Sequence, residues 1–179
     1  MSQPPFLQMR EKRAVLSECR KYRYRLDRYV GGRGVTAAFF GINPSKADAV
    51  IDDATVRKWH GFSRRLGFQR FIVGNIFAYR ATDVRELRRV EDPVGPEWRT
   101  HIDGIIAEAD VLIPCWGNAG KLPLALRDRM SWFIGGLIAT GKPVTCWGLT
   151  KSGDPRHPLM LSYDTPLVDY RLIRGGEDD

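Results

Sequence analysis

The sequence predicts an α/β fold with three layers, α/β/α, around a central, mainly parallel four-stranded sheet. Four short apolar runs, rich in β-branched and aromatic residues, are each followed by turn residues. These runs are 35–42, 71–77, 110–116 and 143–149. Segments with helical periodicity lie between them, and strands that alternate with helices are typical of a parallel sheet covered on both faces.

The three helical segments repeat apolar residues at a spacing of three or four. They are 53–66, 96–109 and 121–140. The first opens with Asp53, a residue type that caps helix N-termini, and the last stops before Gly141, a residue type that ends helices. These start and stop signals support helices between the predicted strands.

The chain has 179 residues, of which 43% are hydrophobic, and this is enough for one domain with its own core. We expect a basic and aromatic extension at 1–34 packed on the domain, an α/β domain at 35–170 and a flexible tail at 171–179. No stretch resembles a signal peptide or a membrane-spanning segment. We therefore expect a cytoplasmic protein without a membrane partner, and we expect a monomer.

The three cysteines, Cys19, Cys115 and Cys146, match neither a zinc-binding pattern nor a disulfide framework. Cys115 and Cys146 lie inside apolar runs, so both are expected to be buried thiols. The sequence therefore predicts no metal ion and no cofactor.

The formal net charge is +7 and the isoelectric point is about 9.6, which favours a polyanionic partner. Nucleic acid is the first candidate and an acidic membrane surface the second. Basic residues concentrate at 10–28 among tyrosines, a combination that suits phosphate contact and base stacking. The DNA-contacting residues expected there are Arg20, Lys21, Arg23 and Arg25. The alternative is an arm packed on the domain with solvated arginines.

Polar side chains accompany the end of each predicted strand. Asn43 follows the first strand, Asn75 lies in the second, Asn118 follows the third, and a polar segment with His157 follows the fourth. In parallel sheets, ligands bind at the carboxyl ends of the strands. We therefore expect one shared site at this edge of the sheet.

Each of these side chains also has a structural interpretation. Asn43 either holds a water molecule or a substrate edge, or it caps the Asn-Pro turn. Asn75 lies in an apolar strand and needs a partner, either backbone or a ligand, and its amide matches the ring edge of a pyrimidine. Asn118 suits a helix cap or a phosphate contact. His157 is either structural or stabilises negative charge.

Taken in order, four motifs resemble the uracil-DNA glycosylase superfamily, nearest its mismatch-specific uracil and thymine branch. The motifs are Gly41-Ile42-Asn43-Pro44, the strand that contains Asn75, Trp116-Gly117-Asn118 and His157-Pro158-Leu159. The resemblance spans roughly 36–167 and implies the fold of that superfamily, a base read by Asn75 and a leucine loop that enters the DNA. The branch with an iron–sulfur cluster is excluded because its four cysteines are not in the sequence.

The whole chain is more similar still to a bacterial and phage family of unknown function. Its motifs are Asn-Pro-Ser-x-Ala-Asp with Asp-Asp nearby, Asn-x-Phe-Ala-x-Arg-Ala-Thr and Thr-Lys-Ser-Gly-x-Pro-Arg-His-Pro-Leu, found here at 43–53, 75–82 and 150–159. Ser45 stands where the strict uracil enzymes have a tyrosine that excludes 5-substituted bases. This smaller side chain predicts tolerance of thymine-like or bulkier 5-modified pyrimidines, such as those of phage DNA.

The resulting hypothesis is a DNA glycosylase that hydrolyses the N-glycosidic bond of a flipped uracil or 5-substituted pyrimidine. Its role would be repair or defence against modified phage DNA. The catalytic candidates are Asn43, His157, Asp52 and Asp53. The base-binding candidates are Gly41, Ile42, Ser45, Phe40, Asn75, Phe77 and Tyr79. The DNA-binding candidates, besides the four basic residues at 10–28, are Lys46, Arg80, Asn118, Lys121, Lys151, Ser152, Arg156 and Leu159.

Three points stay open at this level. One aspartate of Asp52 and Asp53 is expected to cap the helix, and the other is left free to orient water or to stabilise a sugar cation. A non-catalytic nucleic-acid-binding protein with a base-recognition pocket would bind with a steep salt dependence and leave the strand intact. A nucleoside or nucleotide N-glycosidase would act on small molecules and ignore charge reversal in the basic segment.

Overall fold

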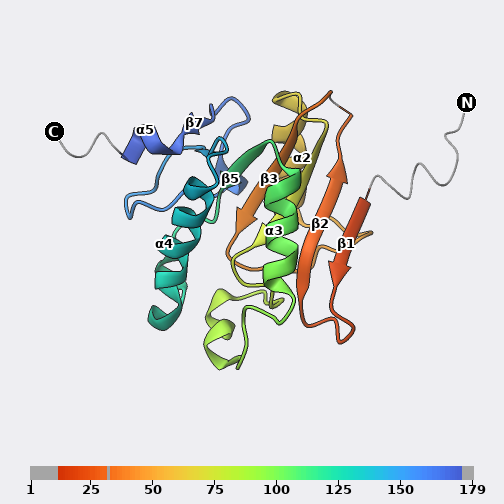
Figure 1. The fold of residues 1–179 in the computed structure, drawn as a ribbon, viewed down its shortest axis with the longest axis vertical. Coiled ribbons are helices and arrows are strands. Elements are labelled where there is room, and N and C mark those ends of the chain that lie inside the picture. Colours follow the sequence, from red (N-terminus) through yellow and green to blue (C-terminus); the bar gives the residue numbers. More distant parts are fainter. Residues whose placement is uncertain (1–11, 32, 175–179) are drawn as a thin grey trace, which may run out of the picture.

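The computed structural model describes residues 12–31 and 33–174, which form a mixed α/β fold (Figure 1). The strands are β1 (Lys12–Leu16), β2 (Arg23–Tyr29), β3 (Thr36–Gly41), β4 (Arg70–Asn75), β5 (Val111–Pro114), β6 (Thr145–Cys146) and β7 (Val168–Asp169). The helices are α2 (Ala54–Arg65), α3 (Trp98–Glu108), α4 (Leu124–Ala139) and α5 (Tyr170–Arg174). Three short 3-10 helices are η1 (Val84–Arg89), η2 (Ala119–Lys121) and η3 (Pro158–Met160). The three helices predicted from periodicity are confirmed as α2, α3 and α4.

The central sheet has five strands in the order β1-β2-β4-β3-β5 and is mixed. Strands β4, β3 and β5 are parallel, whereas β2 runs antiparallel to β4 and β1 antiparallel to β2. The prediction of a four-stranded, mainly parallel sheet is therefore corrected. The parallel core of the prediction is present, and two antiparallel strands extend it.

The expected fourth strand at 143–149 is the first source of the difference. Only β6 forms there, and it pairs with β7 in a separate two-stranded sheet. This segment is linked to the central sheet by an isolated parallel bridge between Val144 and Leu112 of β5. Pro143 has no backbone N–H to donate to a ladder, and Gly148 turns the chain with a φ of 86°. The apolar run is therefore buried without becoming a full strand.

The N-terminal segment is the second source of the difference. The expected extension at 1–34 is corrected, because β1 and β2 are strands of the central sheet; residues 1–11 and 32 lie outside the described residues. The basic composition of β2 did not indicate a buried strand, because Arg28 is buried through a salt bridge to Asp52, which is distant in sequence. The expected tail at 171–179 is also corrected in part, because α5 runs to Arg174 and only 175–179 lie outside the described residues.

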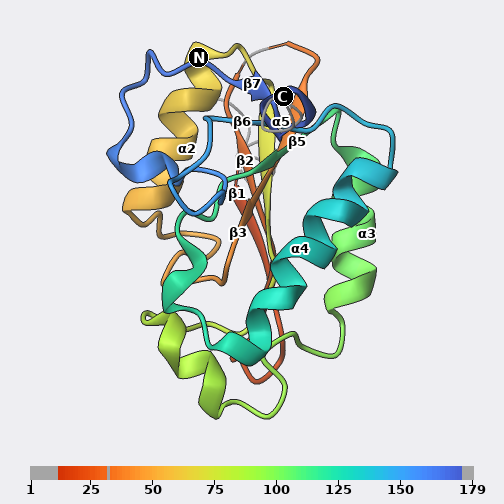
Figure 2. The same ribbon diagram turned by 90° about the vertical axis from the view of Figure 1, so that its left-hand side faces the viewer.

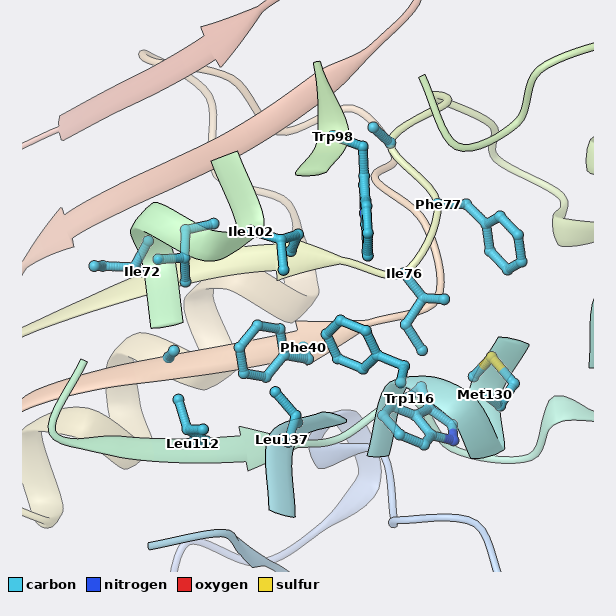
Figure 3. Close-up of a cluster of buried hydrophobic side chains, with 14 of the residues drawn as sticks. Phe40, Ile72, Ile76, Phe77, Trp98, Ile102, Leu112, Trp116, Met130 and Leu137 are labelled. Atoms are coloured by element: carbon cyan, nitrogen blue, oxygen red, sulfur yellow. The ribbon is translucent and has the colours of Figure 1, made fainter. Parts of the chain in front are cut away.

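Helices cover both faces of the sheet, α2 on one face and α3 with α4 on the other (Figure 2). Alternation along β3 divides its side chains between two buried clusters. Phe39 packs with Trp59 of α2, their ring centroids 5.5 Å apart, while Phe40 packs with Phe133 of α4 at 5.2 Å. Figure 3 shows Phe40 among the side chains that α3 and α4 contribute to the second cluster.

Helix α2 carries the local signals that its sequence predicted. The Asp53 side chain accepts a hydrogen bond from the Val56 N–H, and the chain leaves the helix through Gly67, whose φ is 72°. Trp59 and Phe62 are buried against the sheet. These signals fix the start of α2 beside the carboxyl end of β3. Within residues 12–31 and 33–174, no helix has the length and apolar character needed to cross a membrane.

Candidate functional site

A pocket of about 200 Å³ lies where β3, β4 and β5 end. It is smaller than the roughly 300–1,000 Å³ of pockets for drug-sized ligands, so it suits a single small ring. Its walls come from the strand ends, the first turn of α2 and the segment before η3. The lining residues are Arg23, Gly41, Ile42, Asn43, Ser45, Asp53, Thr55, Val56, Trp59, Asn75, Trp116 and His157. The sheet edge chosen from the sequence therefore carries a pocket.

Asn75, the last residue of β4, is 5% exposed and lies against the end of β3. Gly41 makes this possible, because a Cβ atom at position 41 would lie 3.0 Å from the Asn75 Nδ2 atom. Gly41 and Asn75 are paired in the parallel ladder. The glycine of the first motif thus provides the space in which the asparagine of the second motif sits.

Arg23 is buried, with 3% of its surface exposed, and it lines the pocket. The β1–β2 register shifts so that Val15 pairs with Arg25 and Leu16 with Arg23, and bulges of this kind re-aim side chains. The guanidinium donates to Ala47 O at 2.8 Å and to Asn75 Oδ1 at 3.3 Å. Burial lowers its pKa to about 10. The expectation that Arg23 contacts DNA from the surface is therefore corrected.

Arg25 is corrected for a different reason. Its guanidinium donates to both carboxylate oxygens of Asp27 and of Glu108, the last residue of α3. It therefore lies on the α3 face of the sheet and is held by two carboxylates. These hydrogen bonds raise the pKa of Arg25 and lower that of Glu108 to about 2.

The two adjacent aspartates have different environments. Asp53 caps α2 through Oδ1, which accepts from Val56 N at 2.9 Å, and it also lines the pocket. Asp52 is turned away and accepts from Arg28 at 2.6 and 2.8 Å and from Lys12 at 3.2 Å. Burial alone would raise the pKa of Asp52, but its two cationic partners lower the pKa on balance. Asp52 is thus a structural ion-pair partner, which corrects its place among the catalytic candidates.

His157 lines the pocket opposite the strand ends, in the loop before η3. Its Nδ1 accepts a hydrogen bond from Leu159 N at 3.2 Å, so a neutral ring carries its proton on Nε2. Burial lowers the pKa of His157, and the charge of Asp53 opposes part of this effect. The ring is therefore a neutral donor near pH 7.

Asn43 also lines the pocket, but its amide nitrogen is already used. Nδ2 donates to Ala81 O at 2.8 Å and to Pro44 O at 3.1 Å, which is the structural role considered from the sequence. Among the described residues, no donor contacts Oδ1 of Asn43. This oxygen is the atom with which Asn43 could hold a water molecule, and Ser45 and Ile42 lie in the same wall.

The aromatic candidates are corrected. Phe40 and Phe77 are fully buried in the cluster under α3 and α4 and do not line the pocket (Figure 3). Tyr79 packs edge-on against Tyr22 at 5.8 Å, also outside the lining. The aromatic rings of the pocket are instead Trp59 and Trp116.

Sequence reasoning assigned neither tryptophan to the site. Trp59 lies on the apolar face of α2 and reads as a core residue, so only its position in the second turn of a helix at the pocket signals its role. Trp116 precedes Gly117 in the third motif and closes the apolar run 110–116, whose pattern predicts a strand residue. Its Nε1 donates to Asp154 Oδ1 at 3.4 Å, which joins it to the loop that carries His157.

Most of the other DNA-binding candidates are exposed. This group comprises Arg20, Lys21, Lys46, Asn118, Lys121, Lys151, Ser152, Arg156 and Leu159. Asn118 also caps η2 by accepting from Gly120 N, and Ser152 donates to Asp154 at 2.8 Å. Arg80 is half-buried and donates to the backbone carbonyls of Arg20, Ser45 and Lys46 at 3.3–3.5 Å, so it braces the loop after β3.

The expectation that Cys115 and Cys146 are buried is confirmed. Cys115 and Cys146 are buried, and burial raises the pKa of Cys115 to about 12, while Cys19 is exposed. Among residues 12–31 and 33–174, no three side chains of His, Cys, Asp or Glu gather as metal ligands.

Comparison with known proteins gives one family and no individual relative. No curated protein matches the chain, and no solved structure matches it. A family described as "Protein of unknown function (DUF1643)" matches residues 23–159, a span that contains every residue lining the pocket. This agrees with the family of unknown function expected from the motifs. Because the match covers more than half of the sequence, the chain belongs to the family of proteins of unknown function DUF1643.

Proposed function

We propose that this protein is a DNA glycosylase that hydrolyses the N-glycosidic bond of a pyrimidine flipped out of the helix. The observation that carries the proposal is the convergence of Asn43, Asp53, Asn75 and His157 on one small pocket. Chemistry on a base requires its removal from the stack into a pocket of about its own size. Perturbed titratable groups beside a cleft support a functional site, and His157 is such a group.

The pocket groups divide into two chemical sets. Oδ1 of Asp53 caps α2, and no donor from the described part of the chain contacts Oδ2 of Asp53 or Oδ1 of Asn43, so both offer acceptors to a water molecule. That water attacks C1′ of the sugar while the bond from C1′ to the base nitrogen breaks. The carboxylate takes the proton of the water and stabilises the cationic character of the sugar.

The second set stabilises the leaving base. His157 donates from Nε2 to an oxygen of the base as negative charge develops there. Asn75 donates from Nδ2 to the ring edge, since Oδ1 already accepts from Arg23. The base anion then takes a proton, and the products are the free base and an abasic site.

Exposed cations stand beside two of the lining residues in the sequence. Lys46 follows Ser45, and Arg156 precedes His157. Neutralising phosphates with such side chains makes binding fall steeply with salt. Ser45 in the pocket wall is small and leaves room for a substituent at position 5 of the pyrimidine.

The direct test uses the purified protein on duplexes that carry uracil, a thymine mismatch or a 5-modified pyrimidine. Alkaline treatment should reveal abasic sites on at least one duplex, and Asp53→Asn prepared identically should reveal none above background. Because Asp53→Asn is purified in the same way, its inactivity excludes a contaminating glycosylase.

The other outcomes identify the alternatives. Salt-dependent duplex binding without any abasic site would refute catalysis and identify a base-recognition protein. Cleavage of free nucleosides or nucleotides, unaffected by Lys151→Glu and without action on DNA, would identify a small-molecule N-glycosidase.

A further inference from the structure

The buried guanidinium of Arg23 has no charged partner among the described residues. Its hydrogen bonds go to a backbone carbonyl and an amide oxygen, and its Nε, also buried, has no hydrogen-bond partner. Arg28, equally buried in the same strand, is bonded to the Asp52 carboxylate. Because a buried charge is costly unless it is paired, Arg23 differs from Arg28 in lacking a charged partner within residues 12–31 and 33–174, and a bound anion would supply one.

The charges around Arg23 do not supply that partner. Arg80 lies close enough to lower the pKa of Arg23, and within the residues that the structure describes its guanidinium is bonded only to backbone carbonyls. Asp53 is the carboxylate that lines the pocket, and it acts on Arg23 through space without a salt bridge. Asp48 also acts on Arg23 through space, but its Oδ1 accepts from the N–H groups of Val50 and Ile51, as Oδ1 of Asp53 caps α2.

Arg23 also determines which way the Asn75 amide faces. A guanidinium has only donors, so the atom of Asn75 at 3.3 Å must be the oxygen. The Nδ2 group then lies on the other side, next to Gly41 in the pocket wall. The floor of the pocket therefore offers an amide donor with a positive charge directly behind it.

We propose that Asn75 and Arg23 form a binding site for a negatively charged oxygen of the ligand, a carboxylate or a phosphate oxygen. Asn75 Nδ2 donates to the anion, and Arg23 acts through Asn75 as a positioning residue that supplies the charge. Charge-assisted hydrogen bonds of this kind are about twice as strong as neutral ones. The inference rests on the proposed function for its choice of pyrimidine ligands, but its test measures binding and not hydrolysis.

Two matched ligand pairs separate the sources of the anion. The first pair is uracil-5-carboxylate and the neutral, isosteric uracil-5-carboxamide, and the second is uridine 5′-monophosphate and uridine. Binding is measured by the fluorescence of Trp59 and Trp116, which line the pocket. We expect the anion to bind about tenfold more tightly in at least one pair, the effect of one charge-assisted hydrogen bond. The first pair identifies a substituent on the base, and the second identifies a nucleotide phosphate.

The decisive variant is Asn75→Asp, which gives Arg23 a carboxylate partner and removes the donor. It should fold, because it pairs a buried charge, and it should abolish the preference for the anion. The matched control is Gln69→Glu, the same change of charge beside the opposite end of β4, which should leave the preference intact.

Three results overturn the inference: equal binding of the neutral ligand in both pairs, no binding of any of the four ligands, or an anion preference that survives Asn75→Asp. Anion preference without hydrolysis of any DNA overturns the proposed function alone. Hydrolysis of DNA by a protein with no anion preference overturns this inference alone.

Discussion

Gly117 lies directly behind His157, so close that a Cβ atom at position 117 would be 2.9 Å from the Cβ of His157. The backbone of Gly117 has a φ of 74°, and its N–H donates to Pro155 O at 2.8 Å. The end of β5 and the loop that carries the histidine are therefore joined at a glycine. Both the conformation and the clearance require this residue type.

Replacing Gly117 tests whether the position of His157 matters, because the substitution moves the histidine without changing its side chain. Gly117→Ala should cost about 1–2 kcal/mol of stability for the positive φ, and the clash should displace His157 from the pocket. Gly141→Ala is the control, because Gly141 has a φ of 75° but no atom within 4 Å of its added Cβ. Urea denaturation should show a loss for both variants, whereas base excision should fall only for Gly117→Ala. Normal excision by Gly117→Ala would contradict this placement of His157.

The neighbouring aspartates should give opposite phenotypes. Asp52→Asn leaves the buried Arg28 without its carboxylate and should cost about 3 kcal/mol in denaturant unfolding, with excision per folded molecule unchanged. Asp53→Asn retains a good N-cap residue and so should keep its stability within about 0.5 kcal/mol. Excision should nevertheless fall by roughly 10²–10⁴-fold, the range for a lost general base. If Asp52→Asn instead removed activity from a stable protein, the assignment of the two residues would be reversed.

The elements that the sequence predicted best are those with strong local signals. Strands β3, β4 and β5 are continuous apolar runs because both of their faces are buried, and α2 has a cap, an apolar face and a glycine stop. Strand β2 was missed because Arg23 and Arg28 are buried through partners distant in sequence, Asn75 and Asp52. Neither the hydrophobic periodicity nor the composition of a segment predicts pairing with residues distant in sequence.

The sequence also predicted part of the site. Asn43, Asn75 and His157 could be placed together because parallel strands bring their carboxyl ends to one edge. Arg23 could not, since the register shift that turns it into the pocket is a property of the β1–β2 pairing and not of its own sequence. Phe40 was misplaced for a related reason: at the end of a strand, one residue decides whether a ring faces the pocket or the core.

The pH dependence of stability should report the burial of His157. Its folded-state pKa lies below the ordinary value of about 6.5, so the unfolded chain binds more protons as the pH falls through 6.5. Stability is therefore full above that pH and decreases below it. His157→Asn keeps an acceptor for Leu159 N but does not titrate. From about pH 7.5 to about pH 5, its free energy of unfolding should therefore decline less than that of the unmodified protein.

Nuclear magnetic resonance gives the matching observation on the ring itself. The nitrogen shifts of His157 at neutral pH should show a proton on Nε2 and none on Nδ1, because Nδ1 accepts from Leu159 N. Titration of the ring above its ordinary value, or a proton on Nδ1, would contradict the environment described for His157.

The apolar side chains after His157 should matter for paired bases and not for unpaired ones. Leu159 is 41% exposed and Met160 is 91% exposed, although both follow a buried proline in η3. Extruding a paired base costs a few kcal/mol, which a side chain inserted into the vacated stack offsets. Met160→Ala and Leu159→Ala together should leave stability within about 0.5 kcal/mol and reduce excision from a duplex by about tenfold or more, with single-stranded substrate unaffected.

Leu124→Ala is the matched control for this pair, since Leu124 is 77% exposed at the start of α4 and does not line the pocket. Leu124→Ala should leave excision unchanged on both the duplex and the single-stranded substrate. An equal loss on duplex and single strand in the double variant would assign Leu159 and Met160 to the shape of the pocket wall instead. The comparison of the two substrates therefore separates entry of the base from the reaction that follows it.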